Sequence, residues 1–395
     1  MTLHIFNPEH DIALASGLEN FTAPHAGRQL RHDLGFLPAL WATDGDCVLV
    51  DDAELAKTSM QKLAVAARKH LGARAFDNFS IDFLQPGARH VADCDSVEPW
   101  GWDAALCARL RRMGVGDALL PGDEQLREIR EWSHRRTSIW LLKQLFDDGV
   151  ATAISQCPLN DESLGGKSYS IMQPFDQRPL PEEFSSVDEA WSTLACRFRG
   201  GVVKAPWSSS GRGVRFFVKN DDKTEANVKA WARGVIARQG SVVVEPYYKK
   251  VKDFGMEFEA RADGKVRYLG LSLFQTANGA YTGNIVATEQ RKWEMMSRYF
   301  PAEQLYSVKE HICHHLTTLL QGRYQGPLGV DMMVVYAEGG FLLHPCVEVN
   351  LRRTMGHVAL ALAPVDNDLM GVMRITYADG CYKMGIEALK GVKGE

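Results

Sequence analysis

The stretch GVVKAPWSSSGRGVRFFV, residues 201–218, decides the fold of this chain. The valines at 202–203 and the run 214–218 predict two short strands. Between them, Pro206 and the serines and glycines of residues 208–213 predict an irregular loop. Such a loop exposes backbone N–H groups and hydroxyls to a bound anion, and glycine lets the backbone approach it closely. The stretch therefore predicts a strand–loop–strand cover for a phosphate group.

The position of the lysine distinguishes this loop from two other phosphate-binding loops. Lys204 lies in the strand before the loop, whereas a P-loop carries its lysine after the loop, at the start of a helix. The missing helix also argues against a dinucleotide-binding fingerprint. The alternative for this stretch taken alone is an ordinary Gly/Ser hairpin with a surface lysine. The candidate phosphate ligands are Lys204, Ser208, Ser209, Ser210, Gly211 and Gly213.

A second pair of strand-like runs carries three oxygen ligands. The runs 329–335 and 341–350 flank a glycine-containing turn, which predicts an antiparallel hairpin. Asp331 and Glu348 then lie on neighbouring strands, and Asn350 shares one strand face with Glu348 because the two are two residues apart. Two carboxylates and an amide oxygen suit Mg²⁺ that bridges nucleotide phosphates. The alternative is that these residues only cap solvated strand ends.

Taken in order, these motifs resemble the ATP-grasp superfamily. The motifs are the strand lysine, the Gly/Ser hairpin, the strand end VVVEPYY at 242–248, and an aspartate followed by Glu-x-Asn. They are most similar to the carboxylate–amine ligase branch that includes D-alanine–D-alanine ligase, over residues 135–355. The resemblance implies an α/β fold in which an N-terminal doubly wound α/β domain is followed by two α+β subdomains that enclose ATP.

The resemblance also implies which residues hold ATP and the metal. A basic residue near position 135 would reach the phosphates, and the alternative is a solvated arginine pair on a helix. Asp331, Glu348 and Asn350 would hold one or two Mg²⁺, with Mn²⁺ as an alternative ion. The implied nucleotide ligands are Arg135 or Arg136 for the phosphates, Glu245 and the backbone near Tyr247 for adenine, and Asp253, or else Glu257, for the ribose.

The activity that the resemblance implies is ligation. A substrate carboxylate would attack the γ-phosphate of ATP, and an amine would then displace phosphate from the acyl phosphate. Arg352 and Arg353 follow the Glu-x-Asn pair, and guanidinium groups suit a carboxylate or a transferring phosphoryl group. The alternatives are an ATP-grasp kinase and a nucleotide-binding module without turnover, although a complete set of metal ligands disfavours the module.

Substrate ligands are sought in two further places. Glu9, His10 and Asp11 follow the first strand, where open α/β sheets place their ligands. The alternatives are that Asp11 is only an N-cap and His10 a loop residue. Asn284 belongs to a polar loop predicted over residues 278–284, for which the alternative is a plain surface loop. Residues 366–378 are expected to supply a closing helix.

The alternation of strand-like and helical patterns, taken with the resemblance, predicts four consecutive regions of the chain. The first 122 residues combine short apolar strands with amphipathic helices. The parts are an N-terminal α/β domain at 1–122, a helical and irregular connection at 123–185, a small lid subdomain at 186–248 and a large catalytic subdomain at 249–395.

Composition is typical of a soluble enzyme. The chain has 395 residues, of which 45% are hydrophobic and 24% charged, enough for a large core in two or three domains. A net charge of -4 with scattered basic residues gives no reason to expect nucleic acid. The eight cysteines lack CxxC spacing, and neither a signal peptide nor an 18-residue apolar run is present. We therefore expect a cytoplasmic protein with no membrane partner, and leave a homo-oligomer open. Small-molecule carboxylate and amine substrates are what the resemblance implies.

Overall fold

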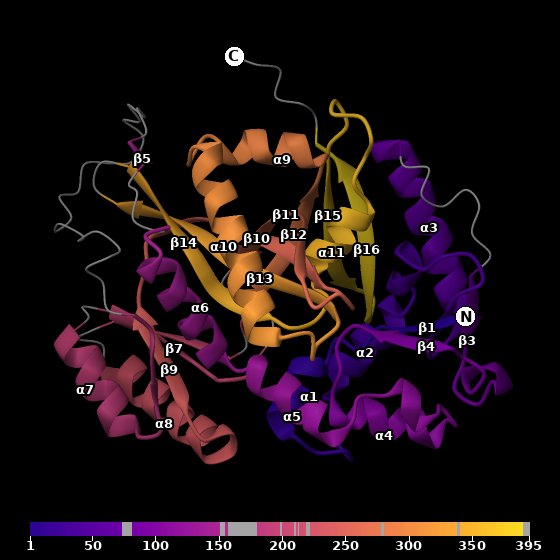
Figure 1. The fold of residues 1–395 in the computed structure, drawn as a ribbon, viewed down its shortest axis with the longest axis horizontal. Helices are drawn as coiled ribbons and strands as arrows, with labels where there is room; N and C mark the ends of the chain where they lie inside the picture. The colour runs from indigo at the N-terminus through magenta and orange to yellow at the C-terminus, as the bar shows by residue number, and fades with distance from the viewer. Residues whose placement is uncertain are drawn as a thin grey trace.

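A computed structural model describes most of the chain, namely residues 1–72, 81–150, 155–156, 180–197, 200–208, 211, 213–218, 222–277, 280–337 and 340–389. The described residues form one parallel and two antiparallel sheets with helices packed on them, which confirms the predicted mixed α/β fold. In Figure 1 the parallel sheet lies at the right, the large sheet in the centre and the small sheet at the lower left. Among these residues, no helix has the length and apolar character needed to span a bilayer.

The parallel sheet has the strand order β3-β2-β1-β4 and carries helices on both faces. Successive residues of β2 point to opposite faces, so Leu49 packs with Leu110 of α4 while Val48 packs with Leu63 of α3. The doubly wound arrangement is therefore confirmed. Its elements are β1 Thr2–Ile5, α1 His10–Ser16, α2 His25–Leu34, β2 Cys47–Leu49, α3 Ala53–Leu71, β3 Asp82–Leu84, β4 Ser96–Pro99 and α4 Ala104–Arg112.

The small antiparallel sheet, called the lid here, has the order β6-β9-β7-β8. Val203 and Val244 face its two helices and form a core with Leu194. The opposite face carries Lys204 and Glu245, which lie on the neighbouring strands β7 and β9. The predicted hairpin over 201–218 is confirmed. The lid elements are β6 Glu182–Phe184, α7 Val187–Arg197, β7 Gly200–Lys204, β8 Val214–Val218, α8 Asp222–Gln239 and β9 Val242–Pro246.

The large antiparallel sheet has the order β16-β15-β12-β11-β10-β13-β14-β5. One face is covered by α6 and α10, whose leucines pack with alternate residues of β10 and β13 such as Met256 and Val330. The residues between them point to the other face. The elements are β5 Ser155–Gln156, β10 Lys250–Ala260, β11 Val266–Ala277, β12 Ala280–Val286, α9 Glu289–Met296, α10 Ala302–Leu320, β13 Gly326–Ala337, β14 Gly340–Asn350, α11 Met355–Ala361, β15 Gly371–Ala378 and β16 Cys381–Ala388.

Two predictions about the large sheet are wrong. Residues 280–286 form strand β12 instead of a polar loop, and residues 371–378 form strand β15 instead of a helix. Asp379 and Gly380 both have positive φ and turn β15 back into β16, as an Asp-Gly hairpin turn does. The β-branched and aromatic residues before this turn fit a strand better than a helix.

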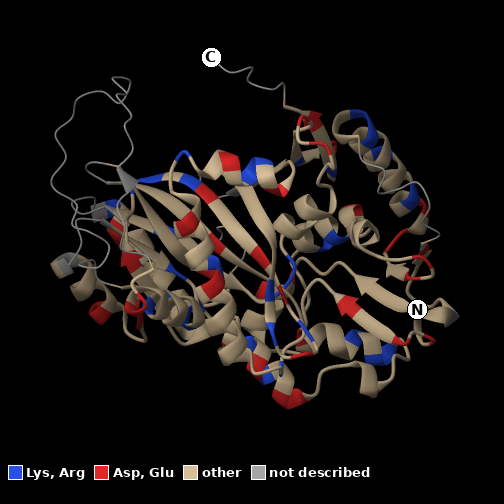
Figure 2. Ribbon diagram, turned by 45° about the horizontal axis from the view of Figure 1, so that its top comes forward, with Lys and Arg blue, Asp and Glu red and all other residues tan. Residues whose placement is uncertain are grey.

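Two helices connect the parallel sheet with the other two. α5 Asp123–Trp132 is followed by α6 Arg135–Asp147, which lies between the lid and the large sheet (Figure 1). The parallel and large sheets also share a core, in which Leu34 and Leu63 pack with Met373 and Ile386. Basic and acidic residues are interspersed along the whole ribbon (Figure 2).

Candidate functional site

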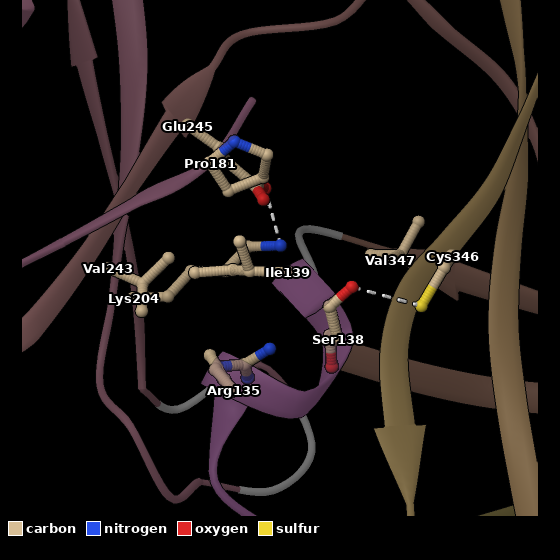
Figure 3. Close-up of a pocket in the computed structure, with 9 residues that line it drawn as sticks. All are labelled: Arg135, Ser138, Ile139, Pro181, Lys204, Val243, Glu245, Cys346 and Val347. Carbon is tan, nitrogen blue, oxygen red and sulfur yellow. Dashed lines mark hydrogen bonds and ion pairs between the residues drawn. The ribbon is translucent and has the colours of Figure 1, made fainter. Parts of the chain in front are cut away.

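The lid contributes a buried ion pair. Lys204 ends β7 and Glu245 lies on the neighbouring strand β9, and the two side chains bind each other on the lid face opposite α7 and α8 (Figure 3). Each residue is only 6% exposed. Removing two opposite charges from water is costly unless they pair, so each group stabilises the other in this position.

Arg135 links the lid to the large sheet. As the first residue of α6, it donates from Nε to the carbonyl of Ala205 at 2.8 Å and from Nη2 to Ser208 Oγ at 3.0 Å. The same Nη2 lies 3.0 Å from Glu348 Oε1 on β14. One guanidinium therefore contacts both the phosphate-loop candidate Ser208 and the metal-ligand candidate Glu348.

Arg136 and Tyr247 lie further out. Arg136 is about half exposed and pairs with Glu131 at 3.3 Å and with Glu183 at 3.0 Å. The geometry therefore selects Arg135 as the arginine that points into the site. Tyr247 follows β9 and is 55% exposed, with its ring edge-on to Phe216 of β8.

The loop between β7 and β8 is described only in part. Ser209 and Ser210 lie outside the described residues. Gly211 has a φ of 71°, a left-handed conformation that glycine adopts without strain. Gly213 packs so closely against Ser208 and Ala205 that a Cβ there would overlap them, and its carbonyl accepts a hydrogen bond from Ala205 N at 2.8 Å.

The large sheet contributes the oxygen ligands. β13 and β14 form the predicted antiparallel hairpin, and their register places Asp331 opposite Glu348 and Gly329 opposite Asn350. All three polar side chains share one face. The amide of Asn350 donates from Nδ2 to Asp331 Oδ2 at 3.1 Å. Two carboxylates and an amide thus meet on neighbouring strands.

The pKa of Asp331 is raised to about 8. Loss of water around this carboxylate is the largest cause, and the negative charges of Glu348 and Glu257 add to it; Arg352 and the hydrogen bond from Asn350 act in the opposite direction. A divalent cation would supply the missing positive charge, and the oxygen-only donor set fits Mg²⁺. Within the described ranges, no group of three His, Cys, Asp or Glu side chains is placed to hold a metal, so such a site would consist of two carboxylates and one amide.

Arg352 connects this face to the parallel sheet. Its Nη2 donates to Asn350 Oδ1 at 2.9 Å, and its Nε lies 2.9 and 3.0 Å from the two oxygens of Asp11 in α1. Asp11 therefore holds the guanidinium in a fixed orientation beside the metal-ligand candidates. The sequence pattern placed Asp11 only among the polar residues after the first strand, because its partner is distant along the chain.

Arg353 points in a different direction. Its Nη2 lies 3.1 Å from Glu98 Oε2, and its guanidinium covers the ring of Trp41 at 4.4 Å. Its Nε is buried and has no hydrogen-bond partner among the described residues. Burial lowers the pKa of Arg353, although Glu98 opposes this. Arg353 lines a cleft of about 600 Å³ between β4, the β10–β11 turn and the start of β13.

Glu257 forms a buried pair that sequence patterning alone could not identify. It lies on β10, is 2% exposed, and places Oε2 3.0 Å from Nδ1 of His357. A Cβ at Gly329 or Gly356 would collide with its carboxylate, so these two glycines make room for it. The signal in the sequence is the alternation of β10, which puts Glu257 on the face opposite Phe258.

Asp253, the other ribose candidate, lies four residues earlier on β10. Its Oδ2 accepts hydrogen bonds from Lys250 Nζ and Thr276 Oγ1, each at 2.5 Å. The Asp253 side chain is 16% exposed, against 3% for Glu257. Of the two acids, Asp253 is therefore the more accessible.

The substrate candidates are held by partners of their own. Glu9 forms an ion pair with Arg31, and burial, the largest influence, raises its pKa despite that arginine. His10 is 1% exposed, packs against Gly101 and has Nε2 buried without a partner in the described part of the chain. Asn284, on β12, is likewise 1% exposed and donates to Ser272 Oγ at 2.9 Å.

The lid and the large sheet close on a small cavity. It has a volume of about 10 Å³ and is lined by Lys204, Glu245, Arg135, Ser138, Ile139, Pro181, Val243, Cys346 and Val347 (Figure 3). α6 is attached to the large sheet here, because Ser138 Oγ accepts a hydrogen bond from Val349 N at 2.9 Å. The two charged groups from the lid and Arg135 of α6 therefore surround one space.

Comparison with known proteins found similarity only at the level of structure. No protein-family model and no curated protein sequence matches the chain. The chain is similar to N5-carboxyaminoimidazole synthetase from Staphylococcus aureus complexed with ADP, at 12% identity and a TM-score of 0.47 over 96% of this chain and 83% of that one. It is also similar to a biotin carboxylase from Campylobacter jejuni in an ATP complex, at 11% identity and a TM-score of 0.46 over 95% and 75% of the two chains. A third similar structure, from Archaeoglobus fulgidus, is assigned to the ATP-grasp superfamily; it has 13% identity and a TM-score of 0.42 over 99% and 100%.

Proposed function

We propose that the chain is an ATP-grasp enzyme that uses ATP and Mg²⁺ to join a carboxylate to an amine. The observation that carries the proposal is that Arg135 links two clusters of charged groups. It lines the small cavity together with the buried Lys204–Glu245 pair, and its Nη2 lies 3.0 Å from Glu348 Oε1. Glu348 lies opposite Asp331 on the neighbouring strand, and Asn350 donates to Asp331, so basic groups for phosphates and oxygen ligands for a cation are joined through Arg135.

Nucleotide binding requires the lid to move. The cavity of about 10 Å³ is far below the roughly 300–1,000 Å³ of a ligand pocket. Opening would separate β7 and β9 from the large sheet and expose Lys204 and Glu245 to the ligand. Lys204 would then bind phosphate oxygens, while Glu245 and the backbone at Tyr247 would accept and donate hydrogen bonds at the adenine edge. Asp253 is the proposed ribose ligand, because Glu257 is enclosed.

Phosphoryl transfer depends on positioning and charge. Asp331, Glu348 and Asn350 would hold Mg²⁺ once the Asn350 amide turns its Oδ1 from Arg352 toward the ion. The ion would offset negative charge on the phosphates. Arg135 would leave Glu348 for a phosphate oxygen, and Arg352, fixed by Asp11, would stabilise charge at the transferring group. A substrate carboxylate oxygen attacks the γ-phosphorus and ADP leaves. The amine nitrogen then attacks the carbonyl carbon, phosphate leaves and the nitrogen loses a proton.

The cleft beside Arg353 is the proposed place for the carboxylate substrate. Its volume of about 600 Å³ suits a small molecule, and its wall includes Trp100 and Tyr324. Arg353 contributes a positive charge to the wall of the cleft. A ligand carboxylate in the cleft would pair with that charge.

The test is a screen of purified protein for ADP release with mixtures of carboxylates and amines. ADP release that needs both a carboxylate and Mg²⁺ supports the proposal. Absence of any nucleotide binding would overturn it. A protein that binds ATP but releases no ADP with any mixture would instead be a binding module.

Hydroxylamine separates the ligase from an ATP-grasp kinase. An acyl phosphate reacts with hydroxylamine to give a hydroxamate, whereas a phosphate ester does not. Enzyme, Mg-ATP, the acid identified in the screen and hydroxylamine, without the amine, should give ADP and hydroxamate in equal amounts. An acid-stable phosphorylated product with no hydroxamate would favour the kinase.

A further inference from the structure

Trp207, in the middle of the lid hairpin, is bound to elements outside the lid. It is 6% exposed, and its ring lies beneath the guanidinium of Arg130 at 4.0 Å and edge-on to His134 at 4.5 Å. Its indole N–H donates to the carbonyl of Arg130 at 2.9 Å. Arg130 and His134 belong to α5 and to the junction between α5 and α6. A lid residue is therefore enclosed by the helical connection.

The backbone on either side of Trp207 is fixed as well. The carbonyl of Pro206 accepts a hydrogen bond from Arg135 N at 3.2 Å, and Trp207 N donates to Gln239 Oε1 of α8 at 3.1 Å. Ser208, the next residue, receives the hydrogen bond from Arg135 Nη2 at 3.0 Å. Three consecutive residues at the start of the Gly/Ser loop are thus positioned by contacts with α6 and α8.

Arg130, whose guanidinium covers the Trp207 ring, is itself held by α1. Arg130 donates from Nε to the carbonyl of Leu14 at the end of α1, at 2.7 Å, so its guanidinium cannot swing away without breaking that bond. Burial, the largest cause, lowers the pKa of His134 to about 4, although Glu183 opposes the shift. His134 is therefore neutral at pH 7, and its ring can pack edge-on against the indole beside three arginines of the same segment.

We infer that Trp207 is a positioning residue that fixes the start of the phosphate loop to the α5–α6 junction. The inference rests on the proposed ATP site and adds a residue to it. Trp207 acts through Ser208 and the loop that follows, and it touches neither adenine nor ribose in the proposed binding mode. Its effect should therefore appear at the phosphates and be absent from the nucleoside.

The lid contains a second pair of the same chemistry that serves as a control. The guanidinium of Arg215 lies 4.8 Å from the ring centre of Trp231, and both residues belong to the lid, on β8 and α8. Trp231 packs against the same lid core that stabilises the hairpin. Truncating Trp231 tests lid stability, whereas truncating Trp207 tests the attachment of the loop to α5 and α6.

The experiment compares two ligands on four proteins. Calorimetry with a non-hydrolysable ATP analogue and with adenosine is carried out on the wild type, Trp207→Ala, Trp207→Phe and Trp231→Ala. We expect Trp207→Ala to raise the Kd of the ATP analogue by about tenfold or more, the size expected for losing one hydrogen bond to a charged phosphate. The Kd of adenosine should change by less than about twofold. Trp207→Phe, which keeps the packing and loses the N–H donor, should fall between wild type and alanine.

Several results would overturn the inference. An equal loss of adenosine and ATP-analogue affinity in Trp207→Ala would mean that Trp207 supports the whole lid. An unchanged ATP-analogue Kd would mean that the contacts of Trp207 with the α5–α6 junction do not position the loop. A selective loss of ATP-analogue affinity in Trp231→Ala would assign the effect to lid stability. If Trp207→Ala does not fold, Trp207→Phe decides by the same comparison. A wild-type protein that binds neither ligand would remove the proposed function together with this inference.

Discussion

Two aspartates in this molecule have opposite surroundings. Asp46, just before β2, accepts hydrogen bonds from Thr2 N at 2.8 Å and from the N–H and hydroxyl of Thr43 at 2.9 and 2.7 Å. Burial acts to raise its pKa, but these hydrogen bonds and one from His4 outweigh it and hold the pKa well below the ordinary value. Asp331 has a pKa raised to about 8, because burial and two neighbouring carboxylates act together.

The difference separates a structural carboxylate from one that we propose to be functional. At Asp46 the chain itself supplies the donors that a carboxylate needs, so its charge stabilises the fold. At Asp331 the chain places Glu348 and Glu257 nearby, and Arg352 and Asn350 do not compensate for them. A strongly shifted pKa is typical of functional sites, and a bound cation would offset the crowded negative charges here.

The largest effect is expected when the buried carboxylate of Glu245 loses its partner. Lys204→Met removes the cation bound to Glu245, which is buried, and we expect a loss of about 3–5 kcal/mol in the free energy of unfolding together with loss of turnover. The double variant Lys204→Met/Glu245→Gln should recover most of the stability and none of the activity. Urea unfolding and ADP release measure the two quantities. A single variant as stable as the wild type would contradict the pairing.

Removing the proposed metal ligands should have the next largest effect. Asp331→Asn and Glu348→Gln should each lower Mg²⁺-dependent ADP release by about 10²–10³-fold, the size of losing one group that stabilises the transition state. Glu294→Gln on α9, whose carboxylate is 47% exposed and pairs with Arg291, is the matched control and should retain activity. Variants with an unchanged Mg²⁺ dependence would rule these residues out as ligands.

Asp46→Asn should have a smaller effect and should act only on stability. The amide cannot accept from Thr2 N and both donors of Thr43 as a carboxylate does, and hydrogen bonds to a charged group contribute about 1.5–3 kcal/mol. We expect a loss in that range in urea unfolding. ADP release per folded molecule should stay at the wild-type level. Lost activity in a folded Asp46→Asn protein would break the contrast with Asp331.

Sequence patterns predicted the parts of the candidate site that depend on a local hairpin. They placed Asp331 and Glu348 on neighbouring strands, and the structure adds that the two residues lie directly opposite each other. The same patterns could not choose between Arg135 and Arg136. Adjacent residues on a helix point in different directions, and the sequence does not show which direction faces the candidate site. Only the tertiary contacts with Ser208 and Glu348 make that choice.

Other features were missed because they join residues far apart in sequence. Arg352 and Arg353 are adjacent, but Asp11 draws one toward Asn350 and Glu98 draws the other toward the cleft. Strand β15 was predicted as a helix, although the Asp-Gly turn that follows it is a local hairpin signal. That error was one of local interpretation, whereas the directions of Arg352 and Arg353 depend on long-range pairing.

The smallest expected effect is a difference in how stability depends on pH, measured with a chelator present. The folded pKa of Asp46 is lowered, so its contribution is complete above the unfolded value of about 4 and is lost as the pH falls below it. The folded pKa of Asp331 is raised to about 8, so its ionisation makes the fold less stable as the pH rises from about 4 to about 8, by at most about 1.4 kcal/mol per pH unit.

The stability deficit of Asp46→Asn should therefore be constant above about pH 5 and shrink in acid. The free energy of unfolding of Asp331→Asn should instead rise steadily relative to that of the wild type between pH 5 and pH 8. Adding Mg²⁺ should reverse this difference, because only the wild type binds the ion well. Parallel pH profiles for the two variants would mean that the two carboxylates do not differ in the way their surroundings indicate.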